Sequence, residues 1–151
     1  MALSYSNTLI LKLPVQRAYE LMGDHALMQH WMPGLIGIEQ VDGMAGQAGS
    51  KAILRFQMGK RLMSMEERVL EADGISRMVV EYHSPMALNR VTKHLQNLEG
   101  GDTQYTMENQ FTFRGVMRFI GPFMKGTFQK TSRGYMERFK AFVESAAETA
   151  V

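Results

Sequence analysis

Hydrophobic and polar positions alternate with a period of two over most of this chain, and the pattern predicts an antiparallel β-sheet. A first run is rich in β-forming residues and stops at Pro14. The alternation then returns repeatedly as far as Gly115, and short turns such as Asp73-Gly74 separate the runs. The predicted strands are residues 6–13, 35–41, 51–58, 62–71, 77–83, 88–98 and 103–114.

Two helices are predicted between the first and second strands. Pro14 suits the first turn of a helix, and an apolar stripe with the 3.6-residue helical period continues from there to Met22. Gly23 ends this helix, and Asp24 can cap a shorter one over residues 25–32.

A long helix is predicted at the C-terminal end of the chain. After Gly115 the period changes to 3.6, which predicts a helix over roughly residues 116–147. Gly121-Pro122 should bend or split it, because proline removes a helical hydrogen bond. This helix is the only predicted element large enough to cover the apolar face of the sheet. We therefore expect one α+β domain over residues 1–151, in which a curved antiparallel sheet wraps around the C-terminal helix.

Four segments carry a resemblance to a known superfamily: Leu13-Pro14-Val15-Gln16-Arg17-Ala18-Tyr19-Glu20-Leu21, Trp31-Met32-Pro33-Gly34, the stretch Gly100 to Thr106, and the Gly121-Pro122 break. In them the chain resembles the START-like helix-grip superfamily (SRPBCC), in its polyketide cyclase/dehydrase-like branch. The resemblance extends over nearly the whole chain. It implies a helix-grip fold with an apolar cavity between the curved sheet and the long helix.

The same resemblance implies no particular reaction. Members that share the fold include lipid and sterol carriers, hormone and quinone binders, aromatase/cyclases and chaperone co-factors, and they have no single catalytic motif. Function must therefore be argued from the residues of the cavity itself.

Composition and motifs exclude several classes of site. The 151 residues include no cysteine, which excludes disulfides, thiolate metal sites and a cysteine nucleophile. His25 and His30 are five residues apart, rather than the four of a helical metal-binding pair. No GxSxG, P-loop or GxGxxG pattern occurs. We therefore expect no metal and no cofactor.

Charge and hydropathy limit the partners and the compartment. The net charge is only +2, which is too small to indicate a nucleic-acid partner. No run of about 18 apolar residues predicts a transmembrane segment, and the first residues lack the regions of a signal peptide, so we expect a cytoplasmic protein. A basic stripe on the C-terminal helix is typical of a solvated helix face, and weak contact with a membrane surface stays open. Monomer and homodimer both stay open.

Methionine is unusually frequent, with 14 residues in the chain. Its flexible side chain suits surfaces that accept varied apolar partners, and many of these methionines fall on the inward faces of the predicted elements. We expect those faces together to line a cavity, although each residue taken alone fits a solid core better. The candidate ligand-binding residues are Leu54, Phe56, Met63, Met65, Glu67, Met78, Val80, Tyr82, Met107, Asn109, Phe111, Phe113, Met117, Met124 and Phe128.

Three polar residues interrupt the inward faces: Glu67, Tyr82 and Asn109. We expect them to form the polar end of a pocket and to orient a hydroxyl or carbonyl group of the ligand; they also fit a structural network or the rim of the sheet. Trp31 is expected to fill the gap between the short helices and the sheet, with a lid over the cavity mouth as the alternative.

The sequence therefore predicts a protein that binds a small hydrophobic molecule, lipid-, polyketide- or quinone-like, with no catalysis evident. Whether it is an enzyme is left open. The first alternative is an aromatase/cyclase-like enzyme acting on a polyketide-type substrate, and the second is a protein-interaction module. Polar groups clustered in a pocket would favour the enzyme, and a dry cavity would favour the binding protein. A solid core with an exposed apolar patch would favour the interaction module.

Overall fold

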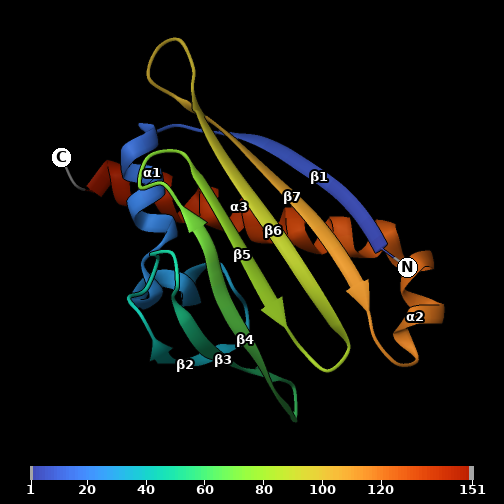
Figure 1. Cartoon of the computed structure of the whole chain (residues 1–151). Helices are drawn as coiled ribbons and strands as arrows, with labels where there is room; N and C mark the ends of the chain where they lie inside the picture. The colour runs from blue at the N-terminus through green and yellow to red at the C-terminus, as the bar shows by residue number, and fades with distance from the viewer. Residues whose placement is uncertain (1, 150–151) are drawn as a thin grey trace.

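An antiparallel sheet curves around the C-terminal helix in the computed structural model, which describes residues 2–149 (Figure 1). The elements, in which η denotes a 3₁₀ helix, are β1 (Ala2–Leu11), α1 (Val15–Met22), η1 (His25–His30), β2 (Leu35–Asp42), β3 (Lys51–Met58), β4 (Arg61–Ala72), β5 (Arg77–His83), β6 (Ala87–Asn97), β7 (Thr103–Phe113), α2 (Met117–Ile120), η2 (Gly121–Met124) and α3 (Lys125–Thr149). This architecture confirms the predicted α+β helix-grip fold.

The sheet has seven strands in the order β1-β7-β6-β5-β4-β3-β2. Strands from β2 to β7 each pair with the next along the chain, whereas β1 pairs with β7. β1 begins at Ala2, four residues earlier than predicted, because β7 supplies hydrogen-bonding partners as far as the Ala2–Thr112 pair. A bulge between Val69 and Glu71 interrupts the regular register of β4 with β5, and such bulges increase the local bend of a sheet.

Helix α3 lies along the sheet on the side of β1 and β7 (Figure 1). Hydrogen bonds fix it to β1 along most of its length. The Tyr5 hydroxyl lies 2.6 Å from Ser132 Oγ, and Lys140 Nζ donates to the Ile10 carbonyl at 2.7 Å. These contacts hold the helix at a fixed distance from the sheet, which determines how much space is left between them.

The predicted break at Gly121-Pro122 is confirmed, because the C-terminal helical region is split into α2, η2 and α3. Gly121 is buried against β7: a Cβ atom at this position would lie 2.6 Å from the ring of Phe113. Only glycine allows this close approach, so the break is fixed by packing as well as by proline.

The second predicted helix is shorter and tighter than expected. The structure has a 3₁₀ helix, η1, where the sequence predicted a helix over residues 25–32. Asp24 caps it as predicted, since its side chain accepts a hydrogen bond from Ala26 N at 3.0 Å.

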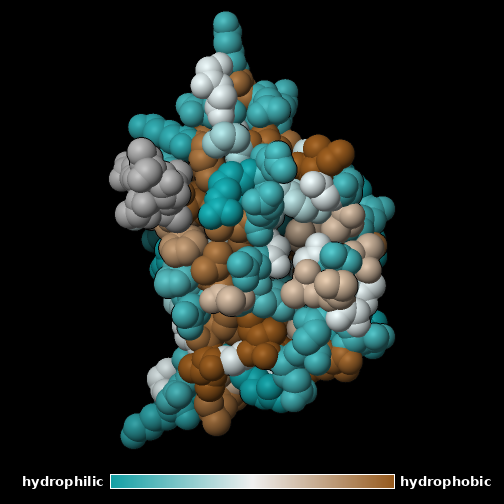
Figure 2. All heavy atoms as spheres, turned by 90° about the vertical axis from the view of Figure 1, so that its left-hand side faces the viewer, coloured by the Kyte–Doolittle hydropathy of each residue, from teal (hydrophilic) through white to brown (hydrophobic). Residues whose placement is uncertain are grey.

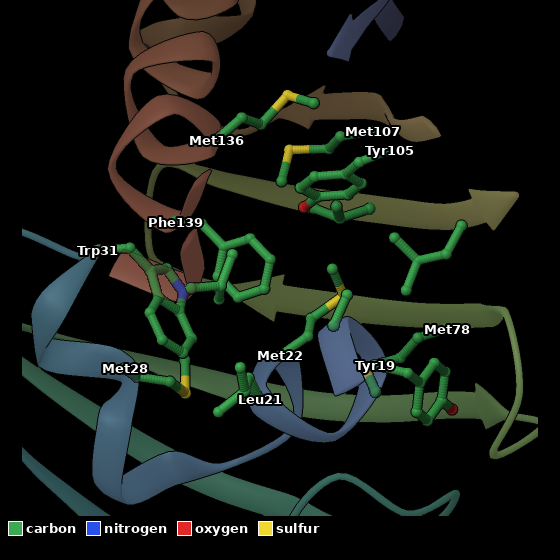
Figure 3. Close-up of a cluster of buried hydrophobic side chains, with 14 of the residues drawn as sticks. Tyr19, Leu21, Met22, Met28, Trp31, Met78, Tyr105, Met107, Met136 and Phe139 are labelled. Atoms are coloured by element: carbon green, nitrogen blue, oxygen red, sulfur yellow. The ribbon is translucent and has the colours of Figure 1, made fainter. Parts of the chain in front are cut away.

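One half of the space between sheet and helix is filled by a close-packed core. The core joins α1, η1 and the C-terminal part of α3 to the sheet, and Figure 3 shows Trp31 beside Phe139 within it. Their rings meet edge to face at 4.9 Å between centroids. The most completely buried apolar members are Leu11, Ala18, Ala52, Leu54, Val80, Met136 and Val143. Within residues 2–149, no helix is long and apolar enough to cross a membrane.

Candidate functional site

The other half of that space holds a cavity of about 300 Å³. This volume lies at the lower end of the range of small-molecule sites. Its walls come from β1, from α1 and the two residues that follow η1, from β4 to β7 and the turn between β5 and β6, and from α2 and α3. The lining residues are Tyr5, Met22, Trp31, Met32, Met63, Met65, Tyr82, Ser84, Met86, Ala87, Asn89, Val91, Lys93, Tyr105, Met107, Asn109, Phe111, Phe113, Met117, Phe128, Thr131, Ser132, Tyr135 and Phe139.

Strand β7 supplies a continuous part of the wall. Alternate residues of a strand point to the same face, so the period-two pattern of β7 directs its residues 105, 107, 109, 111 and 113 toward the helix. Their side chains change along the strand from Tyr105 and Met107 to Asn109, and then to Phe111 and Phe113. The wall is therefore apolar at its two ends and carries an amide in the middle.

An aromatic cluster closes the cavity near the start of α3. The rings of Phe111, Phe113 and Phe128 stack on one another, with centroid separations of 5.0 Å for Phe111–Phe128 and 5.6 Å for Phe113–Phe128. Tyr5 stacks on Phe111 at 6.0 Å. These side chains form a rigid apolar surface, in contrast to the flexible methionines Met63 and Met65 on β4.

A pair of asparagines lies in the wall formed by β6 and β7. Asn89 Nδ2 donates to Asn109 Oδ1 at 3.1 Å. In the part of the chain that the structure describes, the other two atoms, Asn89 Oδ1 and Asn109 Nδ2, are buried without a hydrogen-bond partner. A buried amide normally satisfies both of its polar atoms, so this pair keeps an unused donor and an unused acceptor beside the cavity.

A second polar group, formed by Glu67, His25, Tyr82 and Lys93, lies beyond the asparagines. Glu67 is only 4 % exposed, and its Oε1 atom lies 2.8 Å from His25 Nε2. Burial is the main cause that raises the pKa of Tyr82 well above its ordinary value, and the neighbouring Glu67 carboxylate raises it further. Burial lowers the pKa of Lys93, and the negative charge of Glu67 partly opposes this shift. The carboxylate, the phenol and the amine therefore belong to one electrostatic group at the wall of the cavity.

Burial also raises the pKa values of Tyr105 and Tyr135, which border the cavity from β7 and α3. Their hydroxyl groups therefore stay protonated near neutral pH. Such groups can donate a hydrogen bond to a ligand. Among residues 2–149, no group of three or more His, Asp or Glu side chains is arranged to hold a metal ion.

Comparison with known proteins agrees with this geometry. The sequence profile of the family described as polyketide cyclase / dehydrase and lipid transport matches residues 3–144. The chain belongs to this polyketide cyclase / dehydrase and lipid transport family. No curated protein matches the sequence.

Several solved structures share the fold of this family member. It superposes on the aromatase/cyclase ZhuI from Streptomyces sp. R1128 with a TM-score of 0.80 and 12% identity, covering 95% of this chain and 94% of that one. It also matches Ara h 8.0201, with a TM-score of 0.79, 13% identity and coverage of 96% and 99%. The Mll3558 protein from Rhizobium loti superposes with a TM-score of 0.75 and 18% identity, and the match covers 93% of this chain and 96% of that one. At such low identities these likenesses establish the fold alone.

The predicted candidate residues separate into two groups in this family member. Those that border the cavity are Met63, Met65, Tyr82, Met107, Asn109, Phe111, Phe113, Met117 and Phe128. Those that do not border it are Leu54, Phe56, Glu67, Met78, Val80 and Met124. Leu54, Phe56, Met78 and Val80 belong to the close-packed core, because α1 and η1 cover that part of the sheet. Glu67 is buried against His25, and Met124 is half-buried in η2.

Sequence reasoning missed several polar residues of the cavity, above all Lys93 and Asn89 on β6 and Tyr135 on α3. Strand β6 has polar residues at both parities, so alternation alone does not show which face is inward. Trp31, which was expected to fill the gap beside the short helices, is buried in the core against Phe139 and also borders the cavity.

Proposed function

We propose that this protein binds a small hydrophobic molecule in the cavity between the sheet and α3. The observation that carries the proposal is the cavity of about 300 Å³ itself, walled mainly by methionine and aromatic side chains. A solid core would favour an interaction module instead, because such a module needs no internal space. The family, which includes lipid transport in its description, supports the same conclusion.

The wall chemistry suggests the kind of molecule. Stacked Phe111, Phe113 and Phe128 offer flat surfaces to an aromatic or isoprenoid group, whereas Met63 and Met65 adapt to ligands of different shape. A lipid-, polyketide- or quinone-like molecule fits this combination. The unused donor and acceptor of the asparagine pair would bind a hydroxyl or carbonyl group of that ligand.

The experiment is a titration with an environment-sensitive apolar dye, together with native mass spectrometry of protein purified from its own host. Val91 borders the cavity, so Val91→Phe should fill part of it and weaken dye binding several-fold. Val41 is exposed on β2, so Val41→Phe is the matched control and should leave binding unchanged. If the folded wild-type protein binds neither dye nor any molecule from its host, the proposal is wrong.

A cyclase-like enzyme is the second candidate, because polar groups of Tyr82, Lys93 and the asparagine pair face or adjoin the same cavity. Two of the structurally similar proteins are described as aromatase/cyclases. Incubation with a poly-β-keto thioester would test it. A cyclised product that appears faster than without protein, and that Asn109→Leu reduces, would support the enzyme; turnover no faster than the background would exclude it for that substrate.

A further inference from the structure

Lys93 is a buried basic side chain in the wall of the cavity. It projects from β6, is only 9 % exposed and borders the cavity. Of all Asp, Glu, Lys and Arg residues in the described chain, it alone is part of the cavity wall. An ammonium group placed in an apolar cavity is destabilised unless a negative charge or several acceptors approach it.

The neighbouring groups do not satisfy this requirement. Glu67 is the closest source of negative charge, but its Oε1 atom already lies 2.8 Å from His25 Nε2. Among the side chains of residues 3–145, no carboxylate oxygen comes within 4.0 Å of Lys93 Nζ, and that amine forms no hydrogen bond to these residues. The other titratable side chains of the wall, Tyr5, Tyr82, Tyr105 and Tyr135, are neutral phenols near neutral pH.

We infer that the ligand is an apolar molecule with a single carboxylate, and that Lys93 binds this acidic head while the methionine and phenylalanine walls hold the tail. The inference rests on the proposed function, since it names the ligand class of the same cavity. A charge-assisted hydrogen bond in a dry site is stronger than a neutral one, and the carboxylate removes the cost of the unpaired amine. Long-chain fatty acids and aromatic or isoprenoid carboxylic acids have this chemistry.

The test compares decanoic acid with decanol as competitors of the apolar dye at neutral pH. These molecules share one tail and differ in the head group. Wild-type protein should bind the acid about 10–100-fold more tightly than the alcohol. Lys93→Met keeps the apolar length of the side chain and should abolish this preference while the alcohol binds as before. Lys51→Met, on the exposed side of β3, is the matched control and should keep the preference.

Equal binding of acid and alcohol by the wild-type protein would overturn the inference, as would a preference that survives in Lys93→Met. Both results would leave the proposed function intact, because the dye and the alcohol would still bind. If the dye binds and neither competitor displaces it, the carboxylate inference fails while the proposed function stands, because the protein still binds an apolar molecule. Thermal unfolding of Lys93→Met shows whether the variant is folded.

Large apolar side chains are exposed to solvent at one end of the molecule. Phe119 is 74 % exposed and Phe123 is 90 % exposed, both in the split region between β7 and α3. Leu62 is 70 % exposed beside the turn between β3 and β4, which lies toward the same lower end in Figure 1. Figure 2, which views the molecule from the side opposite α2, shows hydrophobic atoms on the surface toward its lower end, where the turn between β3 and β4 lies in Figure 1. We call these side chains, with Met58, Met86, Val116 and Ile120, the apolar tip.

The chain segments that form the apolar tip carry positive charges and no carboxylates of their own, and Arg90 is paired with Glu81 at 2.7 Å. Residues 57–65, 84–90 and 112–130 contain no Asp or Glu. They contain the cations Lys60, Arg61, Arg90, Arg114, Arg118, Lys125 and Lys130. Arg114 links two of these segments, since its backbone N–H donates to the Met86 carbonyl at 2.8 Å and its Nη1 atom to the Ser84 carbonyl at 3.3 Å.

The apolar tip adjoins the cavity, because Met86 belongs to both and Met117, which follows Val116 of the tip, lines the cavity. Protruding phenylalanines on a segment that carries cations and no carboxylates are complementary to the interface of a bilayer with anionic headgroups. We propose that the apolar tip docks on an anionic lipid surface and places the mouth of the cavity against it. This surface shares Arg114, Arg118, Lys125 and Lys130 with the basic stripe considered for membrane contact in the sequence, and it adds the exposed apolar side chains to them.

Sedimentation with vesicles tests this second proposal. Wild-type protein should bind vesicles of phosphatidylcholine mixed with phosphatidylserine, and bind phosphatidylcholine vesicles or high-salt samples less well. Phe119→Ser combined with Phe123→Ser should reduce binding at least tenfold. Ile75 is 68 % exposed in the turn between β4 and β5, so Ile75→Ser is the matched control and should bind normally. The proposal would be overturned if the wild-type protein bound neither kind of vesicle, or if the double variant bound as well as the wild type.

Discussion

The Tyr5 hydroxyl lies 2.6 Å from Ser132 Oγ, and this bond joins the first strand to the C-terminal helix across 127 positions of the sequence. The same hydroxyl donates to the Phe128 carbonyl at 3.0 Å. Both contacts lie beside the cavity, which Tyr5 and Ser132 help to line. The bond therefore fixes the distance between sheet and helix at the place where the space between them is hollow.

Tyr5→Phe should destabilise the protein by about 1–3 kcal/mol, because Ser132 Oγ and a backbone carbonyl lose their partner in a buried place. Tyr135→Phe is the control: the Tyr135 hydroxyl has no hydrogen bond to any of residues 2–149, so its removal should cost less than about 0.5 kcal/mol. Urea unfolding of both variants measures the difference. Equal losses would mean that the Tyr5 bond contributes nothing specific.

Gly121→Ala should destabilise the protein by about 1–3 kcal/mol, because the new methyl group would lie 2.6 Å from the Phe113 ring and would force β7 and η2 apart. Gly126→Ala has open space around the new methyl group at the start of α3 and should stabilise the helix by up to about 1 kcal/mol. Thermal unfolding compares the two. A neutral Gly121→Ala would show that the break does not need this close approach.

Phe111→Ala should enlarge the cavity and shift binding toward bulkier apolar probes. Its cost should stay below about 3 kcal/mol, because Phe111 already borders empty space on one side. Leu54→Ala, in the close-packed core, should cost about 2–5 kcal/mol and leave the ligand preference unchanged. Dye titration and urea unfolding of each variant provide the measurements. A full large-to-small penalty at Phe111 without any change in binding would indicate that the space around it is not used.

Asn109→Leu should weaken the binding of ligands that carry a carbonyl or hydroxyl group. It should also destabilise the protein by about 1–3 kcal/mol, because Asn89 Nδ2 loses its acceptor. Replacing both members, Asn89→Leu with Asn109→Leu, should recover most of that stability, since no unpaired amide remains. Ligand binding should stay weak in the double variant. If the double variant is less stable than the single one, the two asparagines are not a coupled pair.

Asp73 gives the protein an acid-sensitive contribution to stability. Its Oδ1 atom accepts hydrogen bonds from the backbone N–H groups of Ile75, Ser76 and Arg77 at 2.8, 2.8 and 3.0 Å, and bonds to Arg77 and Ile75 are the main causes that lower the pKa of Asp73 from 3.8 to about 2. Because the folded pKa is below the unfolded one, the contribution is complete above about pH 4 and is lost as the pH falls toward about 2.

Asp73→Asn keeps an acceptor oxygen but has no proton to bind. The difference in Tm between wild type and Asp73→Asn should therefore be largest near neutral pH and shrink as the pH falls toward about 2. Calorimetric unfolding over this range measures the difference. A difference that stays constant with pH would contradict the assignment.

The sequence by itself determined the number and order of the strands, the position of the long helix and the break within it. These features depend on local causes: period-two and period-3.6 patterns, turns such as Asp73-Gly74, and the missing N–H of Pro122. Strand ends were less accurate. The start of β1 at Ala2 depends on pairing with Thr112, which is far away in the sequence.

Only the tertiary structure decided which inward residues pack and which border a cavity. Met78 and Met107 both follow the inward alternation of their strands, yet Met78 lies in the core alone and Met107 borders the hollow half. The difference arises because α1 and η1 pack closely against one part of the concave face, whereas space is left between the other part and the helices α2 and α3. The surroundings of Glu67 and Lys93 could not be predicted from the sequence either, because the partner of a buried charge depends on the folded chain. Glu67 bonds to His25, 42 positions away, whereas no carboxylate oxygen among the side chains of residues 3–145 lies within 4.0 Å of Lys93 Nζ.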